Sequence, residues 1–218
     1  MKKLSTVALA ILLTVFSTAP ARALVDAPTL RLGIGYAPIK FTGGSEYPKP
    51  IPLASLVMLN PMFLWDVPSV RMRLGVHFLA DLGSKYGFVA TSGVGFTGIF
   101  YPLGLSSSRE VNDNFSEIVK TRISPYFQIS LTPLKFSITK PLDAADPRFN
   151  TPSSYPYFNS RVFEIAMGIG LDYPVADDIV AFGGLHYRSA AFTEDESKFG
   201  SITYSGVALL LGVMTNFY

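Results

Sequence analysis

The stretch RVFEIAMGIGLDYPVADDIVAFGGLHYR, residues 161–188, decides the fold class. In its first half, large apolar side chains alternate with small or polar ones. Successive side chains of a β-strand point to opposite faces, so this alternation predicts a strand with one apolar face. Residues 174–178 form a predicted turn, and a second alternating strand runs from Ile179 to about Ala190. The stretch is therefore a predicted antiparallel hairpin, and we expect the rest of the chain to repeat it.

The same alternation recurs along the chain. Besides the hairpin, the predicted strands are Leu30–Ala37, Val70–Leu82, Tyr86–Phe100, Ile118–Leu131, Leu134–Thr139 and Ser201–Tyr218. Residues 53–65 are apolar without a clear period and contain Pro61. They are compatible with an ordered loop on the rim, a short helix or two extra strands. We therefore expect about eight strands, or ten if residues 53–65 supply another hairpin.

Composition indicates where the apolar surface of these strands lies. Charged residues make up 16% of the chain, against about 25% in typical soluble domains. Apolar residues make up 49%, and the mean hydropathy is +0.33. Yet no run after residue 23 approaches the ~20 apolar residues of a membrane-spanning helix. Since only helices and closed barrels satisfy every backbone group in lipid, the sequence predicts an all-β, closed antiparallel transmembrane barrel.

The N-terminus has the pattern of a secretory signal peptide. Lys2 and Lys3 precede an apolar segment, and Ala21-Arg22-Ala23 fits a small-x-small cleavage site. A membrane anchor is the alternative, but about ten apolar residues are too few to span a bilayer. We expect residues 1–23 to be a signal peptide and residues 24–218 to form the barrel. The mature chain would be nearly neutral, which does not indicate a nucleic-acid partner.

Two further features favour a membrane barrel over a soluble sandwich or lipocalin-like barrel. The less apolar face of the strands is rich in Gly, Ala, Ser and Thr, which suits a narrow lumen, and aromatic residues gather near strand ends. Long connections near 42–69, 101–117, 140–160 and 191–200 alternate with short ones near 83–86, 132–133 and 174–178. Long external loops and short periplasmic turns are typical of transmembrane barrels whose two chain ends are periplasmic.

The stretch GIGLDYPVADDIVAFGGLHYRSAAF, residues 168–192, resembles the penultimate hairpin of small bacterial outer-membrane barrels of the OmpA-transmembrane-domain, OmpX and OmpW type. The last residues, Val213-Met214-Thr215-Asn216-Phe217-Tyr218, resemble the aromatic-ended signal read by the outer-membrane insertion machinery, although Asn216 departs from that pattern. The resemblance implies a bacterial outer-membrane location. It also implies contact with outer-membrane lipid and lipopolysaccharide, and assembly by the insertion machinery through the C-terminal strand.

Polar side chains on the less apolar face would line the lumen. The predicted lumen network consists of Arg71, Arg73, His77, Arg122, Glu164, Asp172, His186 and Arg188, and the same register turns Arg31, Asp81 and Lys120 inward. Buried charges must be paired or hydrated. The network is either a polar conduit or gate, or a salt-bridged plug in which Glu164 bonds Arg122 or Arg188. Side chains fill the lumen of an eight-stranded barrel, which favours the plug.

The sequence does not indicate a catalytic, cofactor or metal site. His77 and His186 are the only histidines, and neither has a local Ser-His-acid pattern. With two histidines and no cysteine, a metal centre is not expected. The glycine pairs lie within strands and lack the strand-turn-helix context of a dinucleotide site. We predict a non-enzymatic barrel with a structural or surface-binding role through its external loops. The alternatives are a narrow pore for small solutes and a lipid A-modifying enzyme, and the external ligand is unknown.

Overall fold

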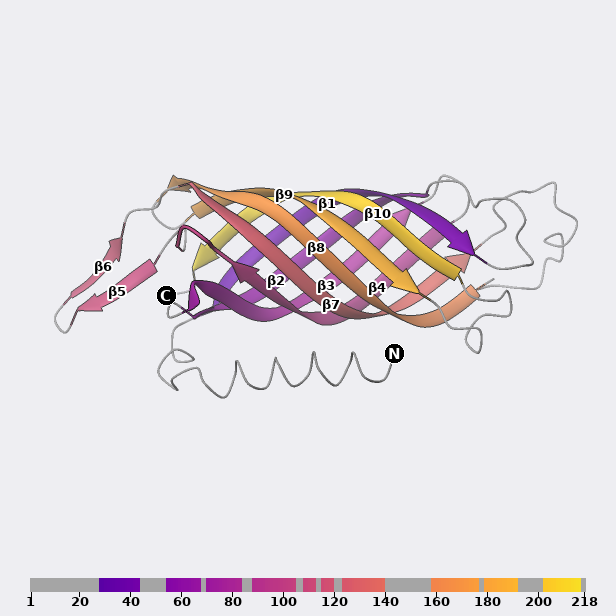
Figure 1. Ribbon diagram of the computed structural model, residues 1–218, viewed down its shortest axis with the longest axis horizontal. Helices are drawn as coiled ribbons and strands as arrows, with labels where there is room; N and C mark the ends of the chain where they lie inside the picture. Colours follow the sequence, from indigo (N-terminus) through magenta and orange to yellow (C-terminus); the bar gives the residue numbers. More distant parts are fainter. Residues whose placement is uncertain are drawn as a thin grey trace, which may run out of the picture.

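The computed structural model describes residues 28–43, 54–67, 70–83, 88–104, 108–112, 115–119, 123–139, 158–176, 179–191 and 202–216. These residues form a closed antiparallel barrel and a separate two-stranded sheet (Figure 1). The barrel strands are β1 (Thr29–Gly43), β2 (Ala54–Val67), β3 (Met72–Gly83), β4 (Phe88–Phe100), β7 (Ser124–Thr139), β8 (Phe158–Ala176), β9 (Ile179–Ala191) and β10 (Ile202–Asn216), and the small sheet pairs β5 (Ser108–Asn112) with β6 (Phe115–Val119). The predicted all-β, eight-stranded closed barrel is confirmed.

The barrel closes because its first and last strands pair. β1 and β10 run antiparallel from Thr29 opposite Asn216 to Gly43 opposite Ile202. Around the ring the order is β1-β10-β9-β8-β7-β4-β3-β2, so every barrel strand has two neighbours and none has a free edge. The described residues contain no helix that is long and apolar enough to cross a membrane.

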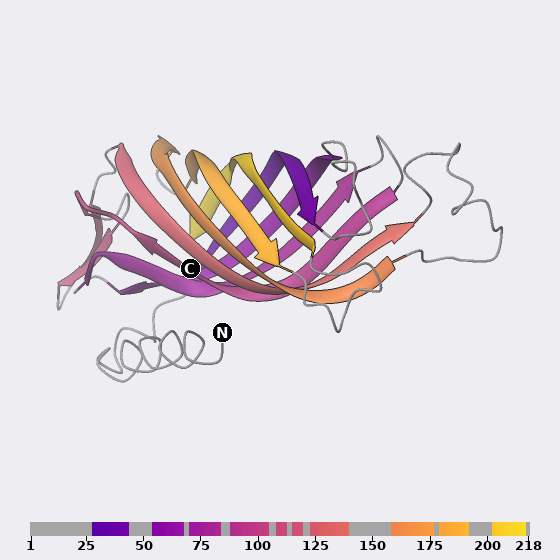
Figure 2. The ribbon, with the colours of Figure 1, turned by 45° about the vertical axis from the view of Figure 1, so that its right-hand side comes forward.

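The two ends of the barrel differ in how the chain connects them. β1 begins and β10 ends at one end, which we call the terminal end; the other is the opposite end. Residues 68–71, 101–123 and 177–178 connect strands at the terminal end, and residues 44–53, 84–87, 140–157 and 192–201 connect them at the opposite end. The β5–β6 hairpin interrupts residues 101–123 and lies beyond the terminal end in both ribbon views (Figures 1 and 2).

Of the segment that the sequence left undecided, residues 54–65 belong to one barrel strand, and residue 53 lies outside the described residues. Residues 54–65 form most of β2, which pairs with β1 and β3 along its length. Both of its faces are apolar: Leu56 and Met58 are buried in the lumen, whereas Val57 and Leu59 are exposed on the outer wall. Period-two alternation is invisible when both faces are apolar, so a rim loop, a short helix and two extra strands were all wrong.

The predicted strands Ile118–Leu131 and Leu134–Thr139 are wrong as separate elements. They correspond mainly to one strand, β7, because pairing with β8 continues through Thr132, Pro133 and Leu134 without a turn. Leu134 therefore faces the lumen and Lys135 faces outward, the reverse of the predicted orientation. This merger offsets the missed β2, which is why the count of eight holds. The extra crossing by β2 places the short residues 84–87 at the opposite end and the long connection after β4 at the terminal end, so the predicted ends of these two connections are exchanged.

The outer wall is apolar, whereas the lumen holds both apolar and polar side chains. Exposed wall residues include Ile34, Val94, Phe96, Met167, Ile169, Leu185 and Leu211. Monomeric soluble proteins rarely expose a contiguous apolar belt of this kind. A soluble sandwich or lipocalin-like barrel turns a polar face to water, so the apolar outer wall excludes that alternative. The wall is built to contact hydrocarbon.

Candidate functional site

Charged side chains fill the lumen at two levels. The first, which we call the opposite-end cluster, consists of Asp81, Thr91, Glu164, Arg188 and Tyr204. The second, the terminal-end cluster, consists of Arg31, Asp66, Arg73, Tyr101 and Asp172. All of these residues except Asp66 are buried. Their strands alternate small and polar inward residues with large outward ones, which directs the charges to the barrel axis.

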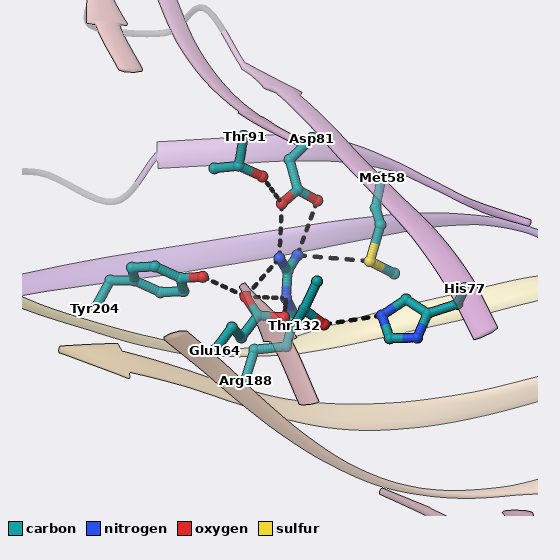
Figure 3. Close-up of polar contacts among 8 residues, drawn as sticks. All are labelled: Met58, His77, Asp81, Thr91, Thr132, Glu164, Arg188 and Tyr204. Carbon is teal, nitrogen blue, oxygen red and sulfur yellow. Dashed lines mark hydrogen bonds and ion pairs between the residues drawn. The ribbon is translucent and has the colours of Figure 1, made fainter. Parts of the chain in front are cut away.

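One guanidinium organises the opposite-end cluster (Figure 3). Arg188 donates from Nη1 to Asp81 Oδ1 at 2.9 Å and from Nη2 to Asp81 Oδ2 at 2.6 Å. The same side chain donates from Nε to both Glu164 oxygens at 3.1 Å and from Nη2 to Oε2 at 2.8 Å. Forked contacts of this kind are the strongest form of an arginine–carboxylate pair. A single cation thus holds two carboxylates that lie on β3 and β8.

Neutral donors complete the opposite-end cluster. The Tyr204 hydroxyl donates to Glu164 Oε2, and the Thr91 hydroxyl donates to Asp81 Oδ2. The Met58 sulfur lies 3.5 Å from Arg188 Nη1. With two carboxylates and one guanidinium the cluster carries excess negative charge, which hydrogen-bond donors offset. Its five members come from five of the eight barrel strands, and Met58 on β2 adds a contact from a sixth, so the cluster braces the ring across its axis.

The terminal-end cluster has a different ratio of cations to acids. Asp172 Oδ1 accepts from Arg31 Nη1 at 3.1 Å, and Asp172 Oδ2 lies 3.7 Å from Arg73 Nη1. The Tyr101 hydroxyl donates to Asp172 Oδ2 at 2.8 Å. Arg73 also donates from Nε to Asp66 Oδ1 at 2.7 Å, and 23% of the Asp66 side chain is exposed. Two cations and two acids therefore balance at this level.

Aromatic rings contact the part of Arg31 that carboxylates do not reach. Arg31 Cζ lies 3.7 Å from the Phe182 ring centroid and 4.6 Å from the Tyr126 ring centroid. Its Nε and Nη2 atoms are buried and have no hydrogen-bond partner. A guanidinium stacked on a ring is attracted by the ring's negative face. The two rings thus stabilise a cation that one carboxylate satisfies only in part.

Neutral polar residues lie between the two clusters. His77 Nε2 is 2.8 Å from Thr132 Oγ1, and Gln128 donates to Ser130 Oγ at 3.1 Å. His186 lies directly over Gly168, where a Cβ would be 2.5 Å from its Nδ1 atom. The glycine is therefore required for the imidazole to fit in the lumen.

Among the described residues, His77 is not part of a catalytic triad. His77 has a hydroxyl partner at Nε2, but its Nδ1 atom is buried and has no hydrogen-bond partner. A serine-protease-like triad needs an acid at that nitrogen to orient the ring. Among the described residues there is also no group of three side chains able to hold a metal ion.

Most residues of the predicted network are brought together in the lumen. Arg73, His77, Glu164, Asp172, His186 and Arg188 are buried there, together with Arg31 and Asp81. Arg122 and Lys120 lie outside the described residues. Of the two predicted partners of Glu164, Arg188 makes the contact.

The inward placement of Arg71 was wrong. It precedes β3, is exposed, and has a left-handed φ of 54°. Its Nη1 donates to the Pro102 carbonyl at 3.0 Å, and its own carbonyl accepts from Tyr101 N at 2.9 Å. The alternation of Val70–Leu82 was extended too far toward the N-terminus. Arg71 instead joins the β2–β3 turn to the end of β4.

Sequence reasoning missed several members of the two clusters. Asp66 was missed because β2 was not recognised, and Tyr101 because the strand was ended at Phe100. Tyr204 was placed on the correct face but not in the network. An inward tyrosine followed on the same face by Gly206 and Ala208 was the available signal, since a buried hydroxyl needs a polar partner.

Comparison with solved structures supports the fold. The crystal structure of Neisserial surface protein A (NspA) matches with a TM-score of 0.53 and 14% identity, covering 86% of this chain and 97% of that chain. The chain has the fold of small outer-membrane β-barrels. Ail, the attachment invasion locus protein of Yersinia pestis, matches with a TM-score of 0.42 and 13% identity over 86% of this chain and 99% of that one. No family model and no curated protein match the sequence. At these identities the likeness concerns the fold alone.

Proposed function

We propose that this protein is a bacterial outer-membrane barrel with a closed lumen, whose function lies in the connections it presents at the cell surface. The observation that carries the proposal is the filled lumen. Arg31, Arg73, Asp172 and Glu164 are at most 1% exposed. A lumen that buries both charge clusters this completely leaves no continuous aqueous path for a solute. The chemistry available to a partner is therefore on the outside.

The strand order supports the orientation. In outer-membrane barrels both chain ends are periplasmic, which makes the terminal end periplasmic and the opposite end external. Three of the four connections at the opposite end are long: residues 44–53, 140–157 and 192–201. Loops on a rigid scaffold carry binding residues more often than cores do. The name of NspA, a surface protein, agrees with this assignment.

Single-channel recording tests the closed lumen. The refolded protein in a planar bilayer is expected to give no steady conductance. A steady, sizeable conductance from the unmodified chain would support the narrow-pore alternative and overturn the proposal.

Tag insertion tests the orientation. A short epitope inserted within residues 140–157 is expected to bind antibody on intact cells. The matched control inserts the same epitope at residues 113–114, between β5 and β6, where labelling should require a permeabilised outer membrane. Reversed labelling would contradict the assignment of the ends.

Two further proposals concern partners and chemistry. We propose that β10 carries the signal read by the barrel-insertion machinery, because its outward residues Val207, Leu209, Leu211 and Val213 form an uninterrupted apolar row. Removal of residues 217–218 should then lower the fraction that is heat-modifiable on gels. The described residues do not favour the lipid A-modifying alternative, and an unchanged lipid A mass profile after expression would remove it.

A further inference from the structure

The outer wall ends differently at the two ends of the barrel. At the terminal end, aromatic side chains such as Trp65, Phe100 and Tyr173 lie on the outward face. At the opposite end, the apolar belt gives way to polar outward residues: Lys40, Ser92, Lys135, Arg161, Ser189 and Ser205. Among the described residues of this rim, the charged ones are all basic. The opposite rim therefore presents positive charge toward the surrounding lipid.

Two of these basic residues face each other directly. Lys135 on β7 is the register partner of Arg161 on β8, and both side chains are exposed on the wall. Directly opposed side chains in an antiparallel pair have Cβ atoms about 4.5–5.5 Å apart, and like charges there are destabilising. On the other side, Lys135 is the register partner of Ser92, which is also exposed. A cation pair of this kind is stabilised when an anion lies between its members.

The depth of the pair matches a lipid headgroup. Below Arg161 the outward residues of β8 are apolar from Phe163 to Leu171 and end at Tyr173. A strand rises about 3.4 Å per residue and tilts by roughly 40° in such barrels, so residues 163–173 advance about 25 Å along the axis. This length is that of the apolar band of an outer-membrane barrel, also about 25 Å. Arg161 and Lys135 thus lie just beyond the hydrocarbon.

We propose that Ser92, Lys135 and Arg161 form a binding site for a phosphate group of a phosphorylated glycolipid in the outer leaflet. The arginine fork matches two phosphate oxygens, the lysine adds a point charge, and the serine hydroxyl donates a further hydrogen bond. The glycolipid is chosen because the pair is at the end assigned to the cell surface, so this inference rests on the proposed orientation. The site lies on the outer wall and is therefore separate from the lumen, which the proposed function takes to be closed.

The chain offers a matched control. Lys40 is also exposed on the opposite rim, but its register partner on β10 is Ser205 rather than a second cation. Losing Lys40 removes one unit of rim charge without touching the pair. A comparison of Lys40 with the pair therefore separates a specific site from a diffuse positive rim.

Native mass spectrometry of the refolded full chain in detergent tests the site. Diphosphorylated lipid A is titrated against wild type, Lys135→Gln/Arg161→Gln and Lys40→Gln, and heat-modifiable migration establishes that each is folded. Each basic residue near an anionic surface contributes about 1 kcal/mol, so the double variant should bind at least about tenfold more weakly. Lys40→Gln should change binding by less than about threefold. Equal weakening by both variants, or by neither, would overturn the site.

Two further binding measurements use wild type alone, so they decide the test even if the double variant does not fold. Wild type should bind dephosphorylated lipid A much more weakly than lipid A, and phosphatidylglycerol more weakly than lipid A. Equal binding of the dephosphorylated form would show that phosphate is not recognised. Equal binding of phosphatidylglycerol would overturn the glycolipid assignment. Neither conductance nor epitope labelling on intact cells depends on these outcomes, so failure of the lipid site is distinguishable from failure of the closed lumen and of the proposed orientation.

Discussion

The two charge clusters in the lumen bury their charges with different ratios of cations to acids. At the opposite end, one guanidinium, Arg188, holds two carboxylates. At the terminal end, the carboxylate of Asp172 lies between two guanidiniums, and one of these has a second acid in Asp66. Breaking a buried ion pair is costly because the remaining charge loses its compensation. The cost of losing a residue therefore depends on how many partners it leaves without a replacement.

By this criterion the opposite-end cluster is the more fragile. Among the described residues, both ion pairs of this cluster are made by Arg188. This side chain links β9 to β3 across the lumen and to the neighbouring β8. In the terminal-end cluster, Arg73 keeps Asp66 if Asp172 is lost, and Arg31 keeps its contacts with Phe182 and Tyr126. Redundant contacts should make the second cluster more tolerant of substitution.

Loss of the central cation is expected to have the largest effect. Arg188→Met leaves Asp81 and Glu164 buried and unpaired, which should cost about 3–5 kcal/mol of unfolding free energy. Urea unfolding in lipid vesicles, followed by fluorescence of the single tryptophan, Trp65, measures it. The triple variant Asp81→Asn/Glu164→Gln/Arg188→Met is the control and should recover most of the loss, since it removes all three charges. A single variant as stable as wild type would show that the cluster contributes little.

Loss of the central acid at the other end is expected to cost less. Asp172→Asn leaves Arg31 without a carboxylate but leaves Arg73 paired with Asp66. We expect about 2–3 kcal/mol in the same assay, below the usual range for a fully orphaned buried charge. If Asp172→Asn proved more destabilising than Arg188→Met, the ranking of the two clusters by redundancy would be wrong.

The neutral donors sharpen the comparison. The Tyr101 hydroxyl donates to Asp172, and its oxygen lies 3.4 Å from Arg31 Nη1 and 3.3 Å from Arg73 Nη1. The Thr91 hydroxyl donates to Asp81, but Arg188 already donates to both oxygens of that carboxylate. Tyr101→Phe should cost about 2 kcal/mol and the near-isosteric Thr91→Val about 1 kcal/mol. Parallel urea titrations of the two variants decide whether the order holds.

Much of the inner face was predictable from alternation alone. Arg73, Asp81, Glu164 and Asp172 each fall at the correct parity within a strand whose other face is plainly apolar. The ion pair between Arg188 and Asp81 was not predictable, because the two residues lie on strands that are not neighbours. Their contact depends on how far the strands are staggered on closure, and no local pattern encodes that stagger.

The errors share a physical cause, which is a local signal that the closed sheet overrides. β2 was hidden because the lumen at its level accepts apolar side chains, so its inward and outward residues look alike. β7 was divided at Pro133, whose side chain faces outward and whose neighbours still pair with β8. A proline removes one donor from a ladder but does not end a strand that two neighbours hold in place.

The smallest expected effect concerns the one partly exposed member of the clusters. Asp66 lies near the terminal end with 23% of its side chain exposed, and its partner Arg73 also lies 3.7 Å from Asp172. Partial solvation screens this pair, and Arg73 keeps an acid when Asp66 is lost. Asp66→Asn should therefore cost about 1 kcal/mol or less, and the cost should shrink as salt is added. Adding Asp66→Asn to Asp172→Asn should cost clearly more than the sum of the two single changes, because the double variant removes both acids that contact Arg73 here. Simple additivity would show that the two acids do not substitute for each other.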